Sequence, residues 1–311
     1  GTRTLKKLVA ASLRKAGMEL RRLSSIRDNV LIVHTNAGKF LLKGFSSNKN
    51  LNSQKKLTRQ LHANGFTKTY RFMEELEPFV YDDYVFAWIE FLSSYRKKFS
   101  FSTRASRQEG LLLLEDFHDK TREFYKDIPV KRFDQVAKWK ERFDEFEGNI
   151  STVKKFVSRD VIQTWLKWGK RSLKGLQRHE GDLYKEPLCV VHGDVAHHNF
   201  FYKDDGSLYL IDFDLISIAP PLIDYLQYSN RIMPVISSSS ELWSYEQLEQ
   251  YKNNQAFLYA LLFPTDIFRE WNRLIRENDF RNNNYLRSVW SLTVEEMPKR
   301  VKMYKEISEL L

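Results

Sequence analysis

Two short apolar runs, Leu188–Val191 and Leu208–Ile211, are each followed by polar side chains whose types and spacing could do chemistry. The runs predict two buried strands, and the sequence Lys-Asp-Asp-Gly-Ser at 203–207 predicts a hairpin turn between them. A strand that ends in ionisable or amide side chains presents them to a ligand from a rigid support. The side chains presented here are His192, Asp194 and Asn199 after the first run, and Asp212 and Asp214 after the second.

The spacing of Asp194, Asn199 and Asp212 matches that of protein kinases, in which a catalytic Asp is followed five positions later by an Asn and then, after a hairpin, by a second Asp. In that arrangement the first carboxylate accepts the proton of the attacking hydroxyl group. The amide oxygen and the second carboxylate hold Mg²⁺, a hard ion that prefers oxygen ligands. We therefore predict Asp194 as the catalytic base, Asn199 and Asp212 as Mg²⁺ ligands, and ATP as the phosphoryl donor.

The chain resembles the aminoglycoside phosphotransferase and choline kinase family of small-molecule kinases in three motifs: HGDVAHHN at 192–199, LYLIDFD at 208–214 and PPLIDYL at 220–226. The glycine that follows the metal-binding Asp in protein kinases is replaced by Phe213-Asp214, as is common in that family. The segments FHDK at 117–120 and VAKWK at 136–140 are similar to the bacterial spore-coat-associated kinase-like branch. The resemblance implies an α+β, bilobal, protein-kinase-like fold, with a small β-rich nucleotide-binding lobe over 1–89 and a larger helical lobe over 90–311.

The residues alone leave a hydrolase site open. His197 and His198, with His192 and Asp194, are also compatible with a zinc or di-metal centre. No second His/Asp cluster occurs elsewhere in the sequence, and a metal centre of this kind would leave Asp212 unexplained. The kinase hypothesis therefore takes precedence.

Three further polar residues have structural interpretations. His192 is better suited to bracing the loop by hydrogen bonds than to catalysis. Asp214 is either a second metal ligand or a turn residue. Asp224, after Pro220-Pro221, resembles a buried Asp that braces the catalytic loop in the family.

Lys43 is the candidate phosphate-binding residue. Two apolar strands, Val30–His34 and Lys39–Lys43, flank a turn at 35–38 and place this lysine near the end of the second strand. A lysine at that position is ordinarily solvated, but a kinase lysine there reaches the α- and β-phosphates. Residues 21–27, before the hairpin, contain no glycine-rich turn, which argues against a protein kinase.

Gln54 takes the place of the glutamate that pairs with this lysine in the family. A helix is predicted over Leu51–Asn64, and no Asp or Glu occurs between Leu51 and Tyr70. The missing acid favours a second hypothesis, a catalytically weak or inactive kinase-like scaffold or spore-coat-associated protein. A Gln54→Glu substitution is expected to restore a charge pair with Lys43.

A second apolar hairpin is predicted from Phe79–Tyr81 and Tyr84–Ile89. Its end, AWIE at 87–90, resembles the segment that connects the two lobes and hydrogen-bonds adenine through its backbone. Ala87 and Ile89 are therefore nucleotide-binding candidates, although a plain core strand fits the same residues. Phe91 replaces the glycine that usually follows.

Composition limits the remaining classes. The 311 residues carry a net charge of +10, which favours an anionic ligand such as a nucleoside triphosphate. The basic residues are scattered along the chain, which argues against a nucleic acid partner. No apolar run is long enough to span a membrane, the N-terminal segment lacks a signal-peptide core, and the single cysteine, Cys189, forms no disulfide framework, so a cytoplasmic protein is expected.

These observations favour an enzyme that transfers the γ-phosphoryl group of ATP to a hydroxyl group of a small molecule. Beyond residue 100 the sequence predicts helices over Arg104–Tyr125, Phe133–Phe146, Ser151–Leu176, Tyr225–Ile236, Tyr245–Leu262, Thr265–Glu277 and Tyr285–Leu310. By the same resemblance, helices of this region wall the acceptor pocket. The acceptor itself is not encoded in any motif.

Overall fold

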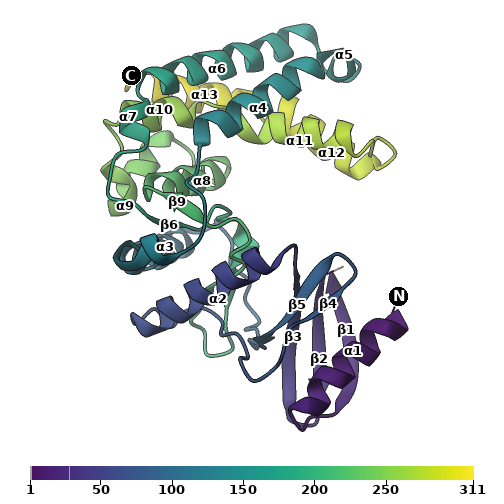
Figure 1. The fold of residues 1–311 in the computed structure, drawn as a ribbon. Coiled ribbons are helices and arrows are strands. Elements are labelled where there is room, and N and C mark those ends of the chain that lie inside the picture. The colour runs from purple at the N-terminus through teal and green to yellow at the C-terminus, as the bar shows by residue number, and fades with distance from the viewer. Residues whose placement is uncertain (1, 28) are drawn as a thin grey trace. The chain divides into compact units, whose positions relative to one another are not determined.

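The computed structural model describes residues 2–27 and 29–311, and the chain divides into two compact units (Figure 1). Unit 1 consists of Gly1–Ser100, Leu112–Lys131 and His192–Ser217. Unit 2 consists of Phe101–Leu111, Arg132–Val191 and Ile218–Leu311. The stretches 112–131 and 192–217 thus belong to the compact unit that contains the N-terminal residues. The division into domains at residue 89 stays a prediction.

A five-stranded antiparallel sheet in the order β1-β2-β3-β5-β4 forms the framework of unit 1. Its strands are β1 (Leu20–Arg27), β2 (Val30–Thr35), β3 (Gly38–Phe45), β4 (Phe79–Tyr81) and β5 (Tyr84–Glu90), and its N-terminal helices are α1 (Thr2–Lys15) and α2 (Asn48–Ala63). Both predicted hairpins and the helix predicted at 51–64 are confirmed. Helix α2 is capped by Ser47, whose side chain accepts a hydrogen bond from the Asn50 N–H.

Alternation along the strands gives this sheet two different faces. Val9 and Leu13 of α1 pack with Leu42 and Trp88 in a buried apolar cluster on one face. Lys43 follows Leu42 on β3, and therefore points to the opposite face. Helix α2 lies against β3 and β5. The sheet thus provides an apolar face for its own core and a second face that carries the candidate lysine.

In unit 1, a short hairpin connects the polar residues of the motif at 192–199 to those of the motif at 208–214. The hairpin pairs β7 (Phe200–Tyr202) with β8 (Leu208–Leu210) and follows the 3₁₀ turn η2 (His197–Asn199). The Thr69 hydroxyl donates to the Leu210 carbonyl oxygen at 2.7 Å, and the Leu210 N–H donates to the Lys68 carbonyl oxygen at 2.9 Å. These bonds fix the hairpin to the segment that follows α2. Helix α3 (Arg104–Phe124) and the turn η1 (Tyr125–Asp127) complete the unit, although the first residues of α3 belong to unit 2.

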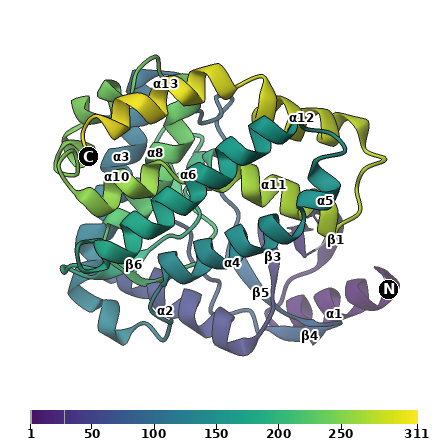
Figure 2. The ribbon, with the colours of Figure 1, turned by 90° about the horizontal axis from the view of Figure 1, so that it is seen from above.

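Unit 2 is mainly helical. Its elements are α4 (Gln135–Gly148), α5 (Ile150–Val153), α6 (Arg159–Arg178), α7 (Glu180–Leu183), β6 (Cys189–Val191), β9 (Ser217–Ala219), α8 (Leu222–Ile232), η3 (Met233–Val235), η4 (Ser239–Ser244), α9 (Glu246–Glu249), α10 (Gln255–Leu261), α11 (Thr265–Arg276), α12 (Asn283–Val294) and α13 (Met297–Ser308). Helix α6 packs against α10, and α4 packs against α11 (Figure 2). At the first contact a Cβ on Gly175 would lie 2.2 Å from the Tyr259 ring, so only glycine fits there. An antiparallel sheet in one unit and helices in the other confirm the predicted fold class.

Three predicted helices are each divided into two, because a second helix begins within the predicted range. The helix predicted over 151–176 divides at 154–158, where extended Ser158 precedes α6. The one over 245–262 divides where the Asn254 side chain caps α10 by accepting from the Phe257 N–H. The one over 285–310 divides at 295–296, because Pro298 lies in the first turn of α13, where a missing N–H is tolerated.

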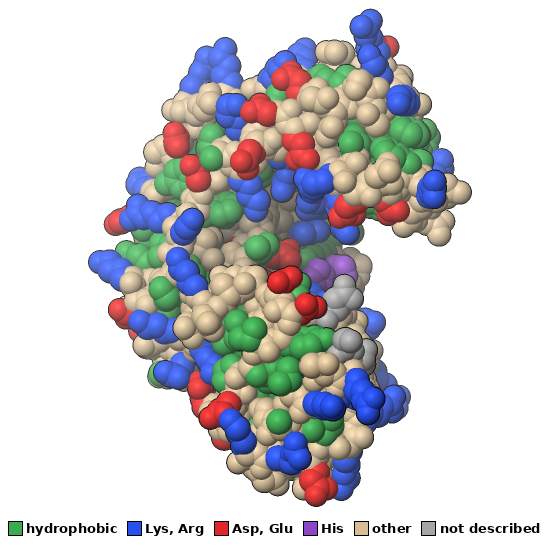
Figure 3. Space-filling view, turned by 45° about the vertical axis from the view of Figure 1, so that its right-hand side comes forward, with side chains coloured by type: hydrophobic (Ala, Val, Ile, Leu, Met, Phe, Trp, Pro, Cys, Tyr) green, Lys and Arg blue, Asp and Glu red, His purple; other side chains and the backbone are tan. Residues whose placement is uncertain are grey.

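The surface shows no segregation of charge on the face drawn in Figure 3, where Lys and Arg side chains are interspersed with acidic ones. Within residues 2–27 and 29–311, no helix is long and apolar enough to cross a membrane. Cys189 is buried, and its Sγ donates to the Ala219 carbonyl oxygen at 3.4 Å.

Candidate active site

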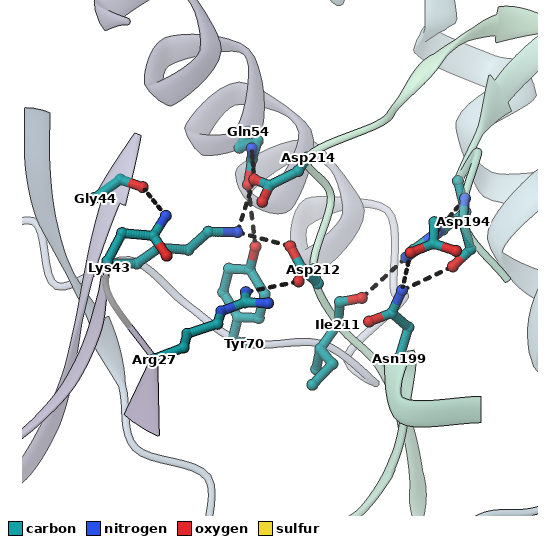
Figure 4. Close-up of polar contacts among 12 residues, drawn as sticks. Arg27, Lys43, Gly44, Gln54, Tyr70, Asp194, Asn199, Ile211, Asp212 and Asp214 are labelled. Atoms are coloured by element: carbon teal, nitrogen blue, oxygen red, sulfur yellow. Dashed lines mark hydrogen bonds and ion pairs between the residues drawn. The ribbon is translucent and has the colours of Figure 1, made fainter. Parts of the chain in front are cut away.

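Lys43 holds two carboxylates in unit 1 (Figure 4). Its Nζ donates to Oδ1 of Asp212 and to Oδ1 of Asp214, each at 2.7 Å. The lysine side chain is only 5% exposed, whereas that of Asp214 is 46% exposed. A buried ammonium group is stable only when opposite charge compensates it. The two carboxylates that follow β8 therefore supply the acidic partners that helix α2 lacks.

Gln54 enters this network through Asp214. Its Nε2 donates to Asp214 Oδ1 at 2.9 Å, the same oxygen that accepts from Lys43. The Tyr70 hydroxyl donates to Gln54 Oε1 at 3.4 Å. Gln54 is buried, so the prediction that it faces the site rather than solvent is confirmed. The glutamate that Gln54 replaces would pair with Lys43 directly, whereas the Gln54 amide hydrogen-bonds Asp214, which in turn holds Lys43.

Asp212 is the most constrained residue of the site. Its backbone has φ of +68°, in the left-handed region that costs free energy for residues other than glycine. Besides Lys43, it accepts a hydrogen bond from Arg27 Nη2 on Oδ2 at 2.9 Å. Burial favours the neutral acid, but the charge of Lys43 and the hydrogen bonds from Lys43 and Arg27 outweigh it and hold the pKa of Asp212 well below its usual range. Asp212 is therefore a carboxylate at neutral pH.

The loop 192–199 is braced from within. The Nδ1 atom of His192 accepts from the Asp194 N–H at 3.3 Å, and its Nε2 lies 2.9 Å from the Ile211 carbonyl oxygen. The imidazole thus accepts on one side and donates on the other, which is the neutral tautomer with the proton on Nε2. Both ring nitrogens are engaged and the side chain is fully buried, so the predicted bracing role of His192 is confirmed and a metal-ligand role does not fit.

Asn199 links Asp194 to the segment after β8 that contains Asp212. Its Nδ2 donates to the Asp194 carbonyl oxygen at 2.8 Å and to Asp194 Oδ2 at 3.2 Å. Its own backbone carbonyl oxygen accepts from the Ile211 N–H at 3.0 Å. Because Ile211 directly precedes Asp212, the structure brings the three predicted residues, Asp194, Asn199 and Asp212, together in one hydrogen-bonded segment (Figure 4).

The donor set fits a magnesium ion better than zinc. Among the residues that the structure describes, no group of three His, Cys, Asp or Glu side chains could hold a metal ion. Mg²⁺ bound with a nucleotide needs only one or two protein oxygens, since phosphates and water complete its shell. Asn199 turns its NH₂ group to Asp194, which leaves its amide oxygen for a hard cation. The carboxylate of Asp212 is the second such oxygen donor.

Ala87 and Ile89 lie in β5, on the same face of the sheet as Lys43. Ala87 pairs with Lys43 of β3, and Ile89 pairs with Leu41. The carbonyl oxygen of the intervening Trp88 accepts a hydrogen bond from the Met73 N–H on the other side of the strand. Backbone groups alternate in direction along a strand, so those of Ala87 and Ile89 face β3 within the ladder. Their side chains, rather than their backbone groups, are presented on the face of Lys43.

The sequence did not indicate the part that two residues, Arg27 and Asp214, take in the site. Arg27 ends a strand with no motif around it, and its bond to Asp212 spans 185 positions of the chain. Asp214 carried a signal, because it follows two residues after Asp212, but the sequence did not separate a metal ligand from a turn residue. Its pairing with Lys43 depends on the tertiary fold.

The fold and the site together define a protein-kinase-like phosphotransferase: a lysine from an antiparallel sheet, held by the carboxylates that follow a catalytic loop. The model of the phosphotransferase enzyme family (APH) matches residues 19–261. The chain belongs to this family. This confirms the predicted membership and makes the class of reaction phosphoryl transfer to a hydroxyl group of a small molecule.

Solved structures with the same fold cover nearly the whole chain. An aminoglycoside phosphotransferase from Alicyclobacillus acidocaldarius has a TM-score of 0.71 at 17% identity, covering 93% of this chain and 92% of the other. Spectinomycin phosphotransferase APH(9)-Ia, in complex with ADP and spectinomycin, has a TM-score of 0.59 at 11% identity, with coverage of 99% and 98%. The choline kinase LicA from Streptococcus pneumoniae has a TM-score of 0.52 at 13% identity, also covering 99% and 98%. At these identities the likeness establishes the fold.

Proposed function

We propose that Asp194, Asn199, Asp212 and Lys43 carry out ATP-dependent phosphorylation of a small hydroxyl-bearing molecule. The observation that supports it best is the convergence of Lys43 on the two carboxylates next to the braced loop. In the reaction the acceptor oxygen attacks the γ-phosphorus, the bond from that phosphorus to the β–γ bridging oxygen breaks, and ADP leaves. Asp194 takes the proton of the acceptor hydroxyl.

Lys43 and the metal ligands would orient the triphosphate. Lys43 contacts the α- and β-phosphates in this proposal, and Asp214 and Asp212 keep its ammonium group in place. Asn199 and Asp212 would hold Mg²⁺, which supplies neutralisation of phosphate charge when bound. Positioning and charge complementarity carry most of the rate enhancement in such reactions.

Adenine binding is proposed for the edge of β5. Ala87 and Ile89 present side chains beside Lys43 and would line the base. Their backbone groups face β3, so the hydrogen bonds to adenine fall to the residues at 91 and 92, just beyond the strand. From 93 onward the backbone is paired again, as the Asp204 N–H donates to the Ser93 carbonyl oxygen.

The acceptor class is inferred from the solved structures. Their names describe enzymes of aminoglycosides, macrolides, spectinomycin and choline, all of which carry hydroxyl groups. We therefore propose a polyol or amino alcohol as the acceptor of this chain. The proposed phosphoryl donor is a nucleoside triphosphate, and the proposed location is the cytoplasm. Association with a bacterial spore coat stays a prediction from the resemblance.

The inactive-scaffold hypothesis loses its main support at Asp214. That hypothesis rested on the absence of an acidic partner for Lys43 in the helix that contains Gln54. In the structure Asp214, from another segment, is that partner. A lysine held by carboxylates and a braced catalytic loop are features expected of an active enzyme.

Asp194→Asn tests the proposal. The variant should bind Mg-ATP as the wild type does, because the base contacts the acceptor and not the nucleotide. Its acceptor-dependent ADP release, measured over a panel of sugars, amino alcohols and aminoglycosides, should fall about 10²-fold or more. Asp204→Asn, which changes an exposed carboxylate in the turn between β7 and β8, is the matched control and should leave both quantities unchanged.

Turnover by Asp194→Asn at the wild-type rate would contradict the role of Asp194. Nucleotide binding by the wild type without ADP release on any acceptor would favour the scaffold hypothesis instead.

A further inference from the structure

We propose that Arg27 is a phosphate-binding residue of the nucleotide site, supplied by a β1–β2 hairpin that lacks a glycine-rich sequence. The inference rests on the proposed function and extends it to a residue outside the family motifs. Arg27 is the last residue of β1, and its Nη2 lies 2.9 Å from Asp212 Oδ2. Lys43 Nζ lies 2.7 Å from the other oxygen of the same carboxylate.

Two cations from different strands thus converge on one anion (Figure 4). A carboxylate and a phosphate offer similar pairs of oxygens to nitrogen donors. Donors that already hold both oxygens of Asp212 are therefore placed to hold two oxygens of a phosphate. The guanidinium group suits this task because its planar fork matches phosphate geometry, whereas Lys43 acts as a point charge.

The backbone next to Arg27 is fixed to β3 at the level of Lys43. Asn29 Nδ2 donates to the Gly44 carbonyl oxygen at 3.0 Å, and the Gly44 N–H donates to the Asn29 carbonyl oxygen at 2.8 Å. Val30 pairs with both Arg27 of β1 and Lys43 of β3. The register of three adjacent strands therefore positions the arginine beside the lysine.

Exposure distinguishes the roles of the two cations. The Lys43 side chain is 5% exposed and has a second carboxylate partner in Asp214. The Arg27 side chain is 52% exposed, against 19% for Asp212, so the arginine end of this ion pair stays in contact with water and gains little stability from the pair. Arg27 can therefore exchange its contact with Asp212 for a contact with a phosphate at little cost in free energy. Asp212 would be a ligand of the Mg²⁺ that accompanies ATP, and Arg27 would then hydrogen-bond the phosphates.

This placement gives a specific substitute for the glycine-rich loop. In protein kinases such a loop covers the phosphates of ATP, and backbone N–H groups of helices or loops are common hydrogen-bond donors to phosphates. Here a charged side chain at the same hairpin would provide the donors, so no glycine is needed at residues 21–27.

Binding affinities of a nucleotide series test the inference. ATP, ADP and adenosine are titrated into wild type, Arg27→Ala and Arg22→Ala by calorimetry in the presence of Mg²⁺. Arg22 is an exposed arginine on the same strand, paired with His34, and serves as the matched control. Arg27→Ala should bind ATP about tenfold more weakly than wild type, since hydrogen bonds to charged groups contribute about that factor. Its affinity for adenosine should equal that of wild type, and Arg22→Ala should match wild type throughout.

Three outcomes would overturn the inference. Equal ATP affinity in Arg27→Ala and wild type would leave Arg27 without a phosphate contact. Tighter ATP binding by Arg27→Ala would mean that the arginine only competes for Asp212. An equal loss for adenosine and ATP would point to damage of the sheet. These results leave the proposed function intact, whereas failure of the wild type to bind any of the nucleotides would overturn both.

Discussion

At the scale of single residues, the partner of Lys43 differs from the one that the family pattern predicts. The sequence correctly indicates that the glutamate of the second helix is missing, and it correctly places Gln54 on the inner side of that helix. It does not indicate the compensation by Asp214, because a residue two positions after Asp212 can point in many directions. The left-handed backbone at Asp212 turns the chain at this point, and the next carboxylate then reaches the lysine.

This geometry changes the expected effect of Gln54→Glu. A carboxylate at position 54 would lose the amide donor and place a like charge beside Asp214 in a buried position. The free energy of unfolding should fall by about 1–3 kcal/mol rather than rise. Adding Asp214→Asn should recover much of this loss, because an amide would again face a carboxylate. Chemical denaturation of the wild type, both single variants and the double variant measures the coupling.

Asn52→Asp, an amide-to-acid change on the exposed side of the same helix, is the control and should stay within about 0.5 kcal/mol of wild type. A Gln54→Glu variant more stable than wild type, or strictly additive effects in the double variant, would show that the introduced carboxylate pairs directly with Lys43.

At the scale of elements, sequence patterns locate most helices and strands of the first hundred residues. Alternating apolar runs with Asn, Asp or Gly turns give the two hairpins, and a glycine follows closely after each N-terminal helix. Patterns fail where two helices follow each other with the same amphipathic period, as on either side of residues 154–158. The separation there depends on local capping, which periodicity does not report.

Gly193, just after β6, allows a close backbone approach next to the site. Its φ is +79°, and a Cβ at this position would lie 2.3 Å from the Leu215 carbonyl oxygen. The loop 192–199 can therefore approach the segment after Asp214 only because residue 193 has no side chain. The sequence contains the glycine, but not the residue that it approaches.

Gly193→Ala should lower both stability and phosphoryl transfer. The left-handed backbone alone costs an alanine about 1 kcal/mol, and the clash with a backbone carbonyl adds to that cost and displaces the loop. Gly206→Ala is the matched control, because Gly206 has φ of +84° but no atom within 4 Å of an added Cβ. Denaturation midpoints and ADP release should show a larger loss for Gly193→Ala in both measurements. Equal effects of the two substitutions would mean that the contact with Leu215 is unimportant.

At the scale of the whole molecule, we expect an ion pair of unit 2 to contribute to the dependence of stability on pH. In unit 2, Arg300 donates from Nη1 to Asp266 Oδ1 at 3.2 Å and also contacts Oδ2. Burial favours the neutral acid, but the charge and hydrogen bonds of Arg300, with the charge of Arg269, outweigh it and lower the pKa of Asp266. The folded state therefore holds this proton less tightly than the unfolded chain does.

Stability from Asp266 is fully present above the pKa of the unfolded chain, about 3.9, and is lost as pH falls through the lower folded value. Asp266→Asn should lower the free energy of unfolding at pH 7 by about 1–3 kcal/mol, and the gap to wild type should narrow at about pH 3. Urea denaturation at both pH values measures this. Asp144→Asn removes an exposed pair with Lys140 and should have little effect at either pH. If the difference in unfolding free energy between Asp266→Asn and wild type is as large at about pH 3 as at pH 7, protonation of Asp266 does not contribute to the loss of stability in acid.

The discontinuity of unit 1 has a consequence for how the protein is made. Its sheet is complete within the first hundred residues, but the carboxylates that hold Lys43 belong to the stretch His192–Ser217. At about 5–20 residues per second on a ribosome, those carboxylates emerge roughly ten seconds after the sheet. During that interval the nascent chain must keep an uncompensated lysine out of the apolar interior. The proposed nucleotide site is therefore assembled late, by closure of a long loop, and no fragment that ends before residue 214 can contain the carboxylates that hold Lys43.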